Sequence, residues 1–155
     1  MSHAQNQITL QPEQSQIGNP NKGPLGIAKG TDENHFAYWS KADSWASWKF
    51  FADEAGLYEV WSEVASIAKH SGVYLNYNDD KVMIHLKGTG SYDKFTPTKL
   101  AVIQLKKGLN TLSLNPHRNQ WEALNIRALK LKRIGDIPKD IQKPFLAHYD
   151  SKNKQ

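Results

Sequence analysis

The chain has 155 residues, no cysteine and a formal net charge of +5. This length suits a single domain with its own core, and the lack of cysteine excludes disulfides and thiolate-bound metals. No apolar run approaches the ~18 residues of a membrane-spanning helix. The polar residues 1–7 do not resemble a signal peptide, which could equally have been removed from a longer chain.

The N-terminal part of the chain gives few regular signals. Short strands are predicted at Ile8–Leu10 and Ser15–Ile17. The segment Gly18–Gly30 is rich in Gly, Pro and Asn and is predicted to be a loop.

An aromatic-rich segment follows. Trp45, Trp48 and Phe51 are three residues apart and could share one face of a helix, although apolar residues in the same segment also alternate. Because Gly56 would cut a helix short, we favour a strand from about Ser47 to Ala52.

Alternation of apolar and polar residues dominates from residue 57 onward, as expected for strands with one buried face. The residues predicted to face the core in the first of these strands are Tyr58, Val60, Ser62 and Val64. Further strands are predicted at residues 73–77, 82–86, 100–105 and 109–114. Asn78-Asp79-Asp80 is predicted to form a hairpin turn between two of them.

The last long strand is predicted over residues 124–134. Its apolar phase runs through Leu124, Ile126 and Ala128 and then changes to Leu129 and Leu131. A change of phase inside one strand indicates a β-bulge. Residues 1–135 are therefore predicted to form the domain, and residues 136–155 a C-terminal extension or linker.

Short strands with turns at this spacing are typical of a β-sandwich or barrel, and three motifs narrow the choice. The motifs are WASWKF at residues 45–50 followed by GLYEV at 56–60, GTGSYDKF at 88–95, and LKKGLNTLSL at 105–114 followed by LNI at 124–126. Their order over about residues 8–134 resembles the galactose-binding-like β-sandwich of family 6 and family 35 carbohydrate-binding modules. Such modules are appended to fucosidases and other glycoside hydrolases. The resemblance implies an all-β, antiparallel two-sheet jelly roll.

The resemblance also implies a sugar site on loops at one end of the sandwich, where aromatic rings hold the sugar and an Asn binds its hydroxyls. Tyr92 matches the aromatic residue of the second motif, and Tyr38 or Trp39 lies where the first loop aromatic is expected. Asn119 lies in the loop before the last strand, and Trp121 stands near its rim. Aromatic side chains suit this task because they offer a large apolar face at low entropic cost.

Each of these residues also has a structural interpretation. Tyr38 and Trp39 could pack at the edge of the core, and Tyr92 could cap the end of a strand. Asn119 could belong to an ordinary turn, and Trp121 could belong to the core as readily as to the site.

The resemblance further implies a structural Ca²⁺ between an acidic residue near the N-terminus and an Asp in the last strand. Glu13 could supply the first ligand, but Arg127 stands near the position of the Asp. We therefore expect no cofactor, no catalytic metal and no strong dependence of stability on Ca²⁺.

The sequence contains no recognisable catalytic motif. Glu59 and Glu63 are the best local pair of carboxylates, but four residues of strand separate them by about 13 Å, which exceeds the spacing in glycosidases. We therefore expect a non-catalytic module that binds an oligosaccharide or polysaccharide, with a structural or protein-interaction accessory domain as the alternative.

The charge is divided unevenly along the chain. Residues 1–93 contain 7 Lys and Arg against 11 Asp and Glu, a net charge of −4, whereas residues 94–155 contain 13 against 4, a net charge of +9. A basic half is compatible with nucleic acid or an acidic polysaccharide, but sequence halves interleave in β folds. We expect no nucleic-acid or membrane partner, and a secreted, periplasmic or cell-surface module that belongs to a larger protein.

Overall fold

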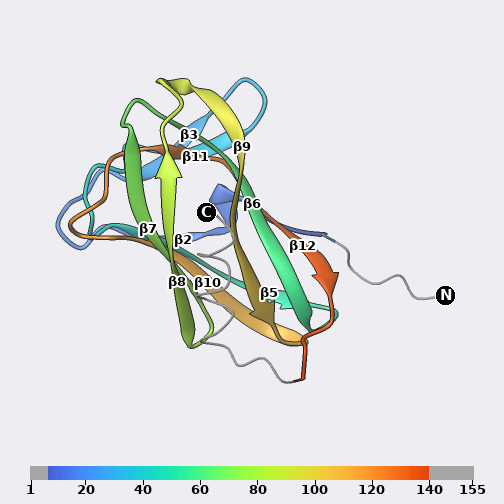
Figure 1. Cartoon of the computed structure of the whole chain (residues 1–155). Helices are drawn as coiled ribbons and strands as arrows, with labels where there is room; N and C mark the ends of the chain where they lie inside the picture. Colours follow the sequence, from blue (N-terminus) through green and yellow to red (C-terminus); the bar gives the residue numbers. More distant parts are fainter. Residues whose placement is uncertain (1–6, 140–155) are drawn as a thin grey trace.

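The structure is a computed structural model that describes residues 7–139. This part of the chain forms two antiparallel sheets packed face to face (Figure 1) and one short 3-10 turn, η1 (Pro12–Gln14). The predicted all-β, two-sheet sandwich is confirmed.

One sheet contains seven strands and the other five. The first has the order β1 (Gln7–Leu10), β12 (Leu129–Gly135), β6 (Gly56–Ser66), β11 (Asn125–Ile126), β4 (Asn34–Ala37), β3 (Gly26–Lys29), with β9 (Ser91–Leu105) also paired to β6. The second has the order β2 (Gln16–Gly18), β5 (Trp45–Ala52), β10 (Gly108–Pro116), β7 (His70–Tyr77), β8 (Asp80–Lys87).

The core lies between the sheets and follows the predicted alternation. Tyr58 and Val60 are completely buried, and Ser62 and Val64 are 4% and 2% exposed. The aromatic-rich segment is a strand, β5, and its pairing with β10 places Trp48 opposite Leu112. The strand interpretation of that segment is therefore confirmed.

The last strand, predicted over residues 124–134, is divided in the structure into β11 and β12, which both pair with β6 and are separated at the predicted change of phase. Ile126 of β11 pairs with Val64 and Lys130 of β12 pairs with Trp61, so four residue steps from β11 to β12 face three steps along β6. The extra residue allows Ala128 and its neighbour Leu129 both to be buried.

Two strands escaped the sequence analysis. β3 lies inside the predicted loop Gly18–Gly30, and β4 follows it as the second strand of a hairpin. β3 is an edge strand with no fully buried residue, and Ile27 is 38% exposed. Because edge strands of this kind bury little apolar surface, they leave no clear alternation in the sequence.

The last described strand ends at Gly135, where the domain was predicted to end. Most of the predicted C-terminal extension, residues 140–155, lies outside the described residues. Within residues 7–139, no helix is long and apolar enough to cross a membrane.

Candidate functional site

A cleft of about 370 Å³ opens at the end of the sandwich where β4, β11 and the start of β9 meet, drawn uppermost in Figure 1. Its polar lining comes from His35, Tyr38, Ser40, Tyr92 and Asn125. We call it the loop cleft. Three of the predicted site residues, Tyr38, Trp39 and Tyr92, therefore lie around one hollow, although Tyr38 and Tyr92 are 54 positions apart in the sequence.

Tyr38 is held outward by its backbone. It follows β4 directly and has a φ of +61°, a left-handed conformation that is uncommon for a residue other than glycine. The Ser40 N–H donates a hydrogen bond to the Tyr38 carbonyl (2.9 Å), which closes a tight turn. The turn leaves the Tyr38 side chain 70% exposed while its neighbour Trp39 is completely buried.

Trp39 forms the floor beneath this turn. Its indole nitrogen donates to the Ser44 carbonyl (3.0 Å), and its own carbonyl accepts a hydrogen bond from the Trp121 indole (2.8 Å). Its ring also contacts those of Phe36 and Trp121, with centroids 5.5 Å and 5.3 Å apart. Trp39 thus has no exposed ring face for a ligand, and Trp121 packs against the core rather than lining the loop cleft.

Tyr92 and Asn125 form the opposite wall. The Asn125 side-chain amide donates to the Tyr92 carbonyl (3.0 Å), which ties the start of β9 to β11. Tyr92 remains 38% exposed. The Asn125 side-chain oxygen accepts no hydrogen bond from the described residues, so it is available as an acceptor.

His35 is the most distinctive polar residue of the cleft. Its Nδ1 atom is buried and has no hydrogen-bond partner among the described residues. The ring packs against Phe95 with centroids 5.2 Å apart, and the Arg127 guanidinium lies over the same phenyl ring, 4.0 Å from its centroid. Burial lowers the pKa of His35 below its ordinary value, Arg127 lowers it further, and Asp93 opposes the shift.

The pKa of His35 makes a pH effect on stability testable. The folded state holds the proton less tightly than the unfolded state, so stability is complete above the unfolded pKa of about 6.5 and decreases as the pH falls below it. We expect His35→Gln to lose less melting temperature than the parent protein between pH 7.5 and pH 5.5, as measured by thermal unfolding. Equal losses in the two proteins would contradict this assignment.

Asn119 is not brought to the loop cleft. It is exposed in a turn after β10, where its N–H donates to Nδ1 of His117 (3.2 Å). The amide at the cleft is Asn125, which stands in the third sequence motif itself. The sequence analysis quoted Asn125 only as part of that motif and selected Asn119 for the site, and no pattern in the sequence singles out His35.

Arg127 is engaged in ion pairs. Its guanidinium contacts Glu63 at 3.1 Å and Glu33 at 3.7 Å. Glu59 in turn pairs with Lys99 at 3.5 Å. The described residues include no group of three His, Cys, Asp or Glu arranged to hold a metal, and Glu13 is exposed in η1. Independence from Ca²⁺ stays a prediction.

The fold is similar to that of known carbohydrate-binding modules. A family 35 module from Clostridium thermocellum is 16% identical over 84% of this chain and all of its own, with a TM-score of 0.70. The C-terminal family 6 module of the laminarinase LamC from Zobellia galactanivorans is 13% identical over 83% of this chain and all of its own, with a TM-score of 0.65.

The same fold also occurs inside larger enzymes. An exo-β-1,3-galactanase from Phanerochaete chrysosporium is 14% identical, with a TM-score of 0.67, over 82% of this chain but only 29% of the enzyme. No protein-family model and no curated protein sequence matches the chain. The structural likeness therefore identifies the chain as a β-sandwich with the fold of family 35 and family 6 carbohydrate-binding modules.

Proposed function

We propose that this chain is a non-catalytic carbohydrate-binding module and that the loop cleft is its sugar site. The observation that carries the proposal is the grouping of two exposed tyrosines, an amide and a histidine side chain around one hollow. In this assignment Asn125 and His35 take the polar role that the sequence resemblance gave to Asn119.

The chemistry of the lining suits a sugar. Tyrosine rings offer an apolar face to the C–H groups of a sugar ring. The Asn125 carbonyl and the neutral His35 imidazole can accept hydrogen bonds from hydroxyls, and the Tyr38 and Tyr92 hydroxyls can donate or accept them. A volume of about 370 Å³ is at the small end for ligand sites, so we infer that one or two sugar units occupy the cleft.

The lining does not suit glycoside hydrolysis. That reaction uses a pair of carboxylates flanking the scissile bond, and no Asp or Glu of the described residues lines the loop cleft. The fold neighbours include isolated binding modules as well as modules joined to enzymes. We therefore propose a secreted, periplasmic or cell-surface protein in which this domain serves a larger glycan-processing chain.

The proposal is tested by titration calorimetry of the purified chain with a panel of neutral and acidic oligosaccharides. We expect a dissociation constant between micromolar and millimolar, about −4 to −8 kcal/mol, because a small open cleft leaves much of the sugar in water. Tyr92→Ala should weaken binding about 5- to 30-fold, since it removes a stacking surface worth about 1–2 kcal/mol.

The matched control uses two asparagines. Asn125→Ala should weaken binding by a similar factor, whereas Asn119→Ala, the same substitution outside the cleft, should change it less than twofold. If both asparagine variants bind as the parent does, the site assignment is wrong. If no oligosaccharide binds, a structural or protein-interaction accessory domain becomes the better function.

A further inference from the structure

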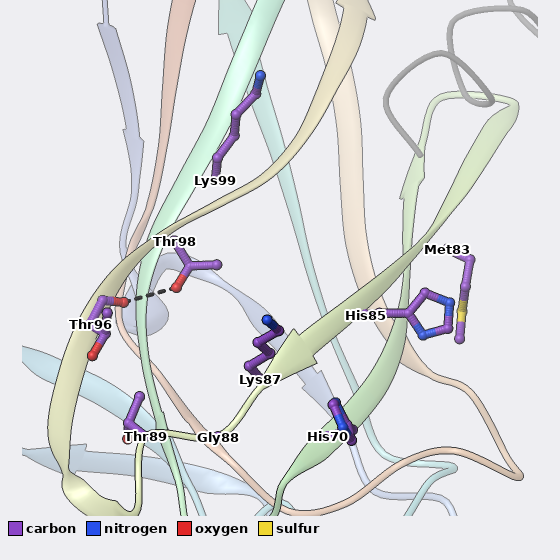
Figure 2. A pocket seen from close by; sticks show the side chains of 9 residues that line it. All are labelled: His70, Met83, His85, Lys87, Gly88, Thr89, Thr96, Thr98 and Lys99. Carbon is purple, nitrogen blue, oxygen red and sulfur yellow. Dashed lines mark hydrogen bonds between the residues drawn. The ribbon is translucent and has the colours of Figure 1, made fainter. Parts of the chain in front are cut away.

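A second and larger hollow lies away from the loop cleft, between the edge strand β8 of one sheet and β9 of the other (Figure 2). Its volume is about 690 Å³, and it shares no lining residue with the loop cleft. We call it the strand cleft. Its main polar lining residues are His70, His85, Lys87, Thr96, Thr98 and Lys99.

The register of the five-stranded sheet explains how one wall is built. His70 pairs with Lys87 across β7 and β8, and Gly72 pairs with His85. Directly paired residues project from the same face of a sheet. Val82, Ile84 and Leu86 fill the core from the other face, so His85 and Lys87 stand together on the outer face at the sheet edge.

The connection from β8 to β9, residues 88–90, holds the β9 wall of the cleft against the β8 wall. The backbone N–H groups of Thr89 and Gly90 both donate to the Ser66 carbonyl, at 2.9 Å and 3.0 Å. Gly88 passes so close to the neighbouring loop that a Cβ there would overlap the Ala68 carbonyl oxygen. These contacts hold the connection to the body of the domain, so the strand cleft is largely preformed.

The lining combines positive charge with hydroxyl groups. Lys87 and Lys99 both border the cleft, and the described residues contribute no Asp or Glu to its lining. Lys99 is already paired with Glu59 at 3.5 Å. Lys87 makes no ion pair with any residue between 7 and 139 and is exposed at the cleft. An anion entering the cleft would therefore find Lys87 without a competing carboxylate.

The threonines indicate that the ligand also carries hydrogen-bond donors. The Thr98 hydroxyl donates to the Thr96 carbonyl at 3.0 Å (Figure 2), so its oxygen is left to accept hydrogen bonds. A hydroxyl-rich molecule can use such acceptors, and Met83 adds an apolar contact on the opposite side. A bare inorganic anion could use only the hydrogen-bond donors of the lining, whereas a charged sugar would also use the threonine acceptors and the apolar contact.

We propose that the strand cleft is a second carbohydrate site and that it binds an acidic saccharide, with its carboxylate or sulfate paired to Lys87. The threonine oxygens accept hydrogen bonds from the sugar hydroxyls, and the imidazoles of His70 and His85 border the anionic group. The choice of ligand class rests on the proposed function, but the site and its residues are separate from the loop cleft.

The test uses three oligosaccharides of equal length, namely oligogalactose, oligogalacturonate and sulfated oligogalactose, at low and moderate salt. We expect Lys87→Gln to weaken binding of at least one of the two acidic oligosaccharides about tenfold at low salt, the loss of one charge-assisted contact worth about 1.4 kcal/mol. Added salt should weaken the same complex in the parent protein. The carboxylated and sulfated probes show which anionic group the cleft prefers.

Lys107→Gln is the matched control, because Lys107 is exposed in the turn between β9 and β10 and carries the same charge. It should change acidic-sugar affinity less than twofold. If the two lysine variants lose the same affinity for acidic sugar, the effect is one of net charge and the proposal is overturned. Unchanged binding in Lys87→Gln would also overturn it. An oligonucleotide that binds with the same Lys87 dependence would also overturn it in favour of a general polyanion site.

Tyr92→Ala separates this proposal from the proposed function. We expect it to leave the Lys87-dependent binding of acidic sugar unchanged and to weaken the binding of whichever sugar occupies the loop cleft. If acidic sugar binds but depends on Tyr92 alone, the strand-cleft proposal fails while the loop cleft stands. If binding depends on Lys87 and no ligand depends on Tyr92, the strand-cleft proposal stands and the loop-cleft assignment fails. If no oligosaccharide binds, both proposals fail.

Discussion

Replacing Trp39 with Ala is expected to destabilise the domain by about 3–5 kcal/mol, the usual cost of removing a buried Trp. The side chain is completely buried and packs against the rings of Phe36 and Trp121. Its loss also leaves the Ser44 carbonyl without its indole donor, and Ser44 is itself fully buried. Chemical denaturation monitored by fluorescence or circular dichroism measures the change.

The neighbouring residue supplies the control. Tyr38→Ala removes an aromatic side chain at the next position, but that side chain is 70% exposed, so stability should change by less than about 0.5 kcal/mol. Tyr38→Ala should instead weaken sugar binding at the loop cleft while the protein remains fully folded. If Trp39→Ala is as stable as the parent protein, the floor of the cleft is not built as described.

This contrast between adjacent aromatics shows where sequence analysis reached its limit. Alternation in β6, β7 and β8 predicted which residues face the core because one buried face imposes a period of two. Tyr38 and Trp39 lie in a turn with a positive φ, where no period applies. The sequence could identify both as candidates for the site, but only the backbone conformation decides which ring is exposed.

The position of the site amide illustrates a second limit. Asn119 and Asn125 flank the same connection before β12, and the family resemblance assigned the site amide to the first. The structure brings Asn125 to the cleft because β11 pairs with both β4 and β6. That pairing joins residues about 60 to 90 positions apart, so no local signal in residues 117–126 contains it.

The strand cleft depends on distant contacts in the same way. Its lysines, Lys87 and Lys99, each lie one position outside the strands predicted at residues 82–86 and 100–105. The excess of basic residues after residue 93 left an acidic ligand open. The connection at Gly88 and Gly90 brings the edges of the two sheets together. The structure therefore offers one specific position, Lys87, at which an acidic ligand can be tested.

Asn110 belongs to the third sequence motif and holds its turn together. Replacing it with Ala is expected to lower the free energy of unfolding by about 2–3 kcal/mol. The side chain is 1% exposed. Its amide donates to the carbonyls of Lys106 (2.8 Å) and Gly108 (3.1 Å), and its carbonyl accepts from the Lys106 N–H (3.2 Å). These bonds close the turn between β9 and β10, in which Gly108 has a φ of +102°.

The same side chain joins this turn to a second one. The side-chain amide of Asn78 donates to the side-chain oxygen of Asn110 at 2.9 Å, and the backbone N–H of Thr111 donates to the side-chain oxygen of Asn78 at 3.1 Å. The sequence predicted the hairpin turn at Asn78-Asp79-Asp80, but it could not show that this turn shares a hydrogen-bond network with the turn between β9 and β10. Alanine at position 110 removes the side chain on which both turns depend, so its effect should exceed that of one ordinary hydrogen bond.

Asn115→Ala is the matched control for Asn110→Ala, because Asn115 lies on the same strand, is only partly buried and uses its amide in a single 2.8 Å bond to Ser113. We expect that control to cost less than about 1 kcal/mol. Denaturant midpoints of the parent protein and the two variants give the comparison. Equal costs for the two substitutions would mean that Asn110 makes no special contribution, and that the glycine and the strand alternation of the motif suffice to form the turn.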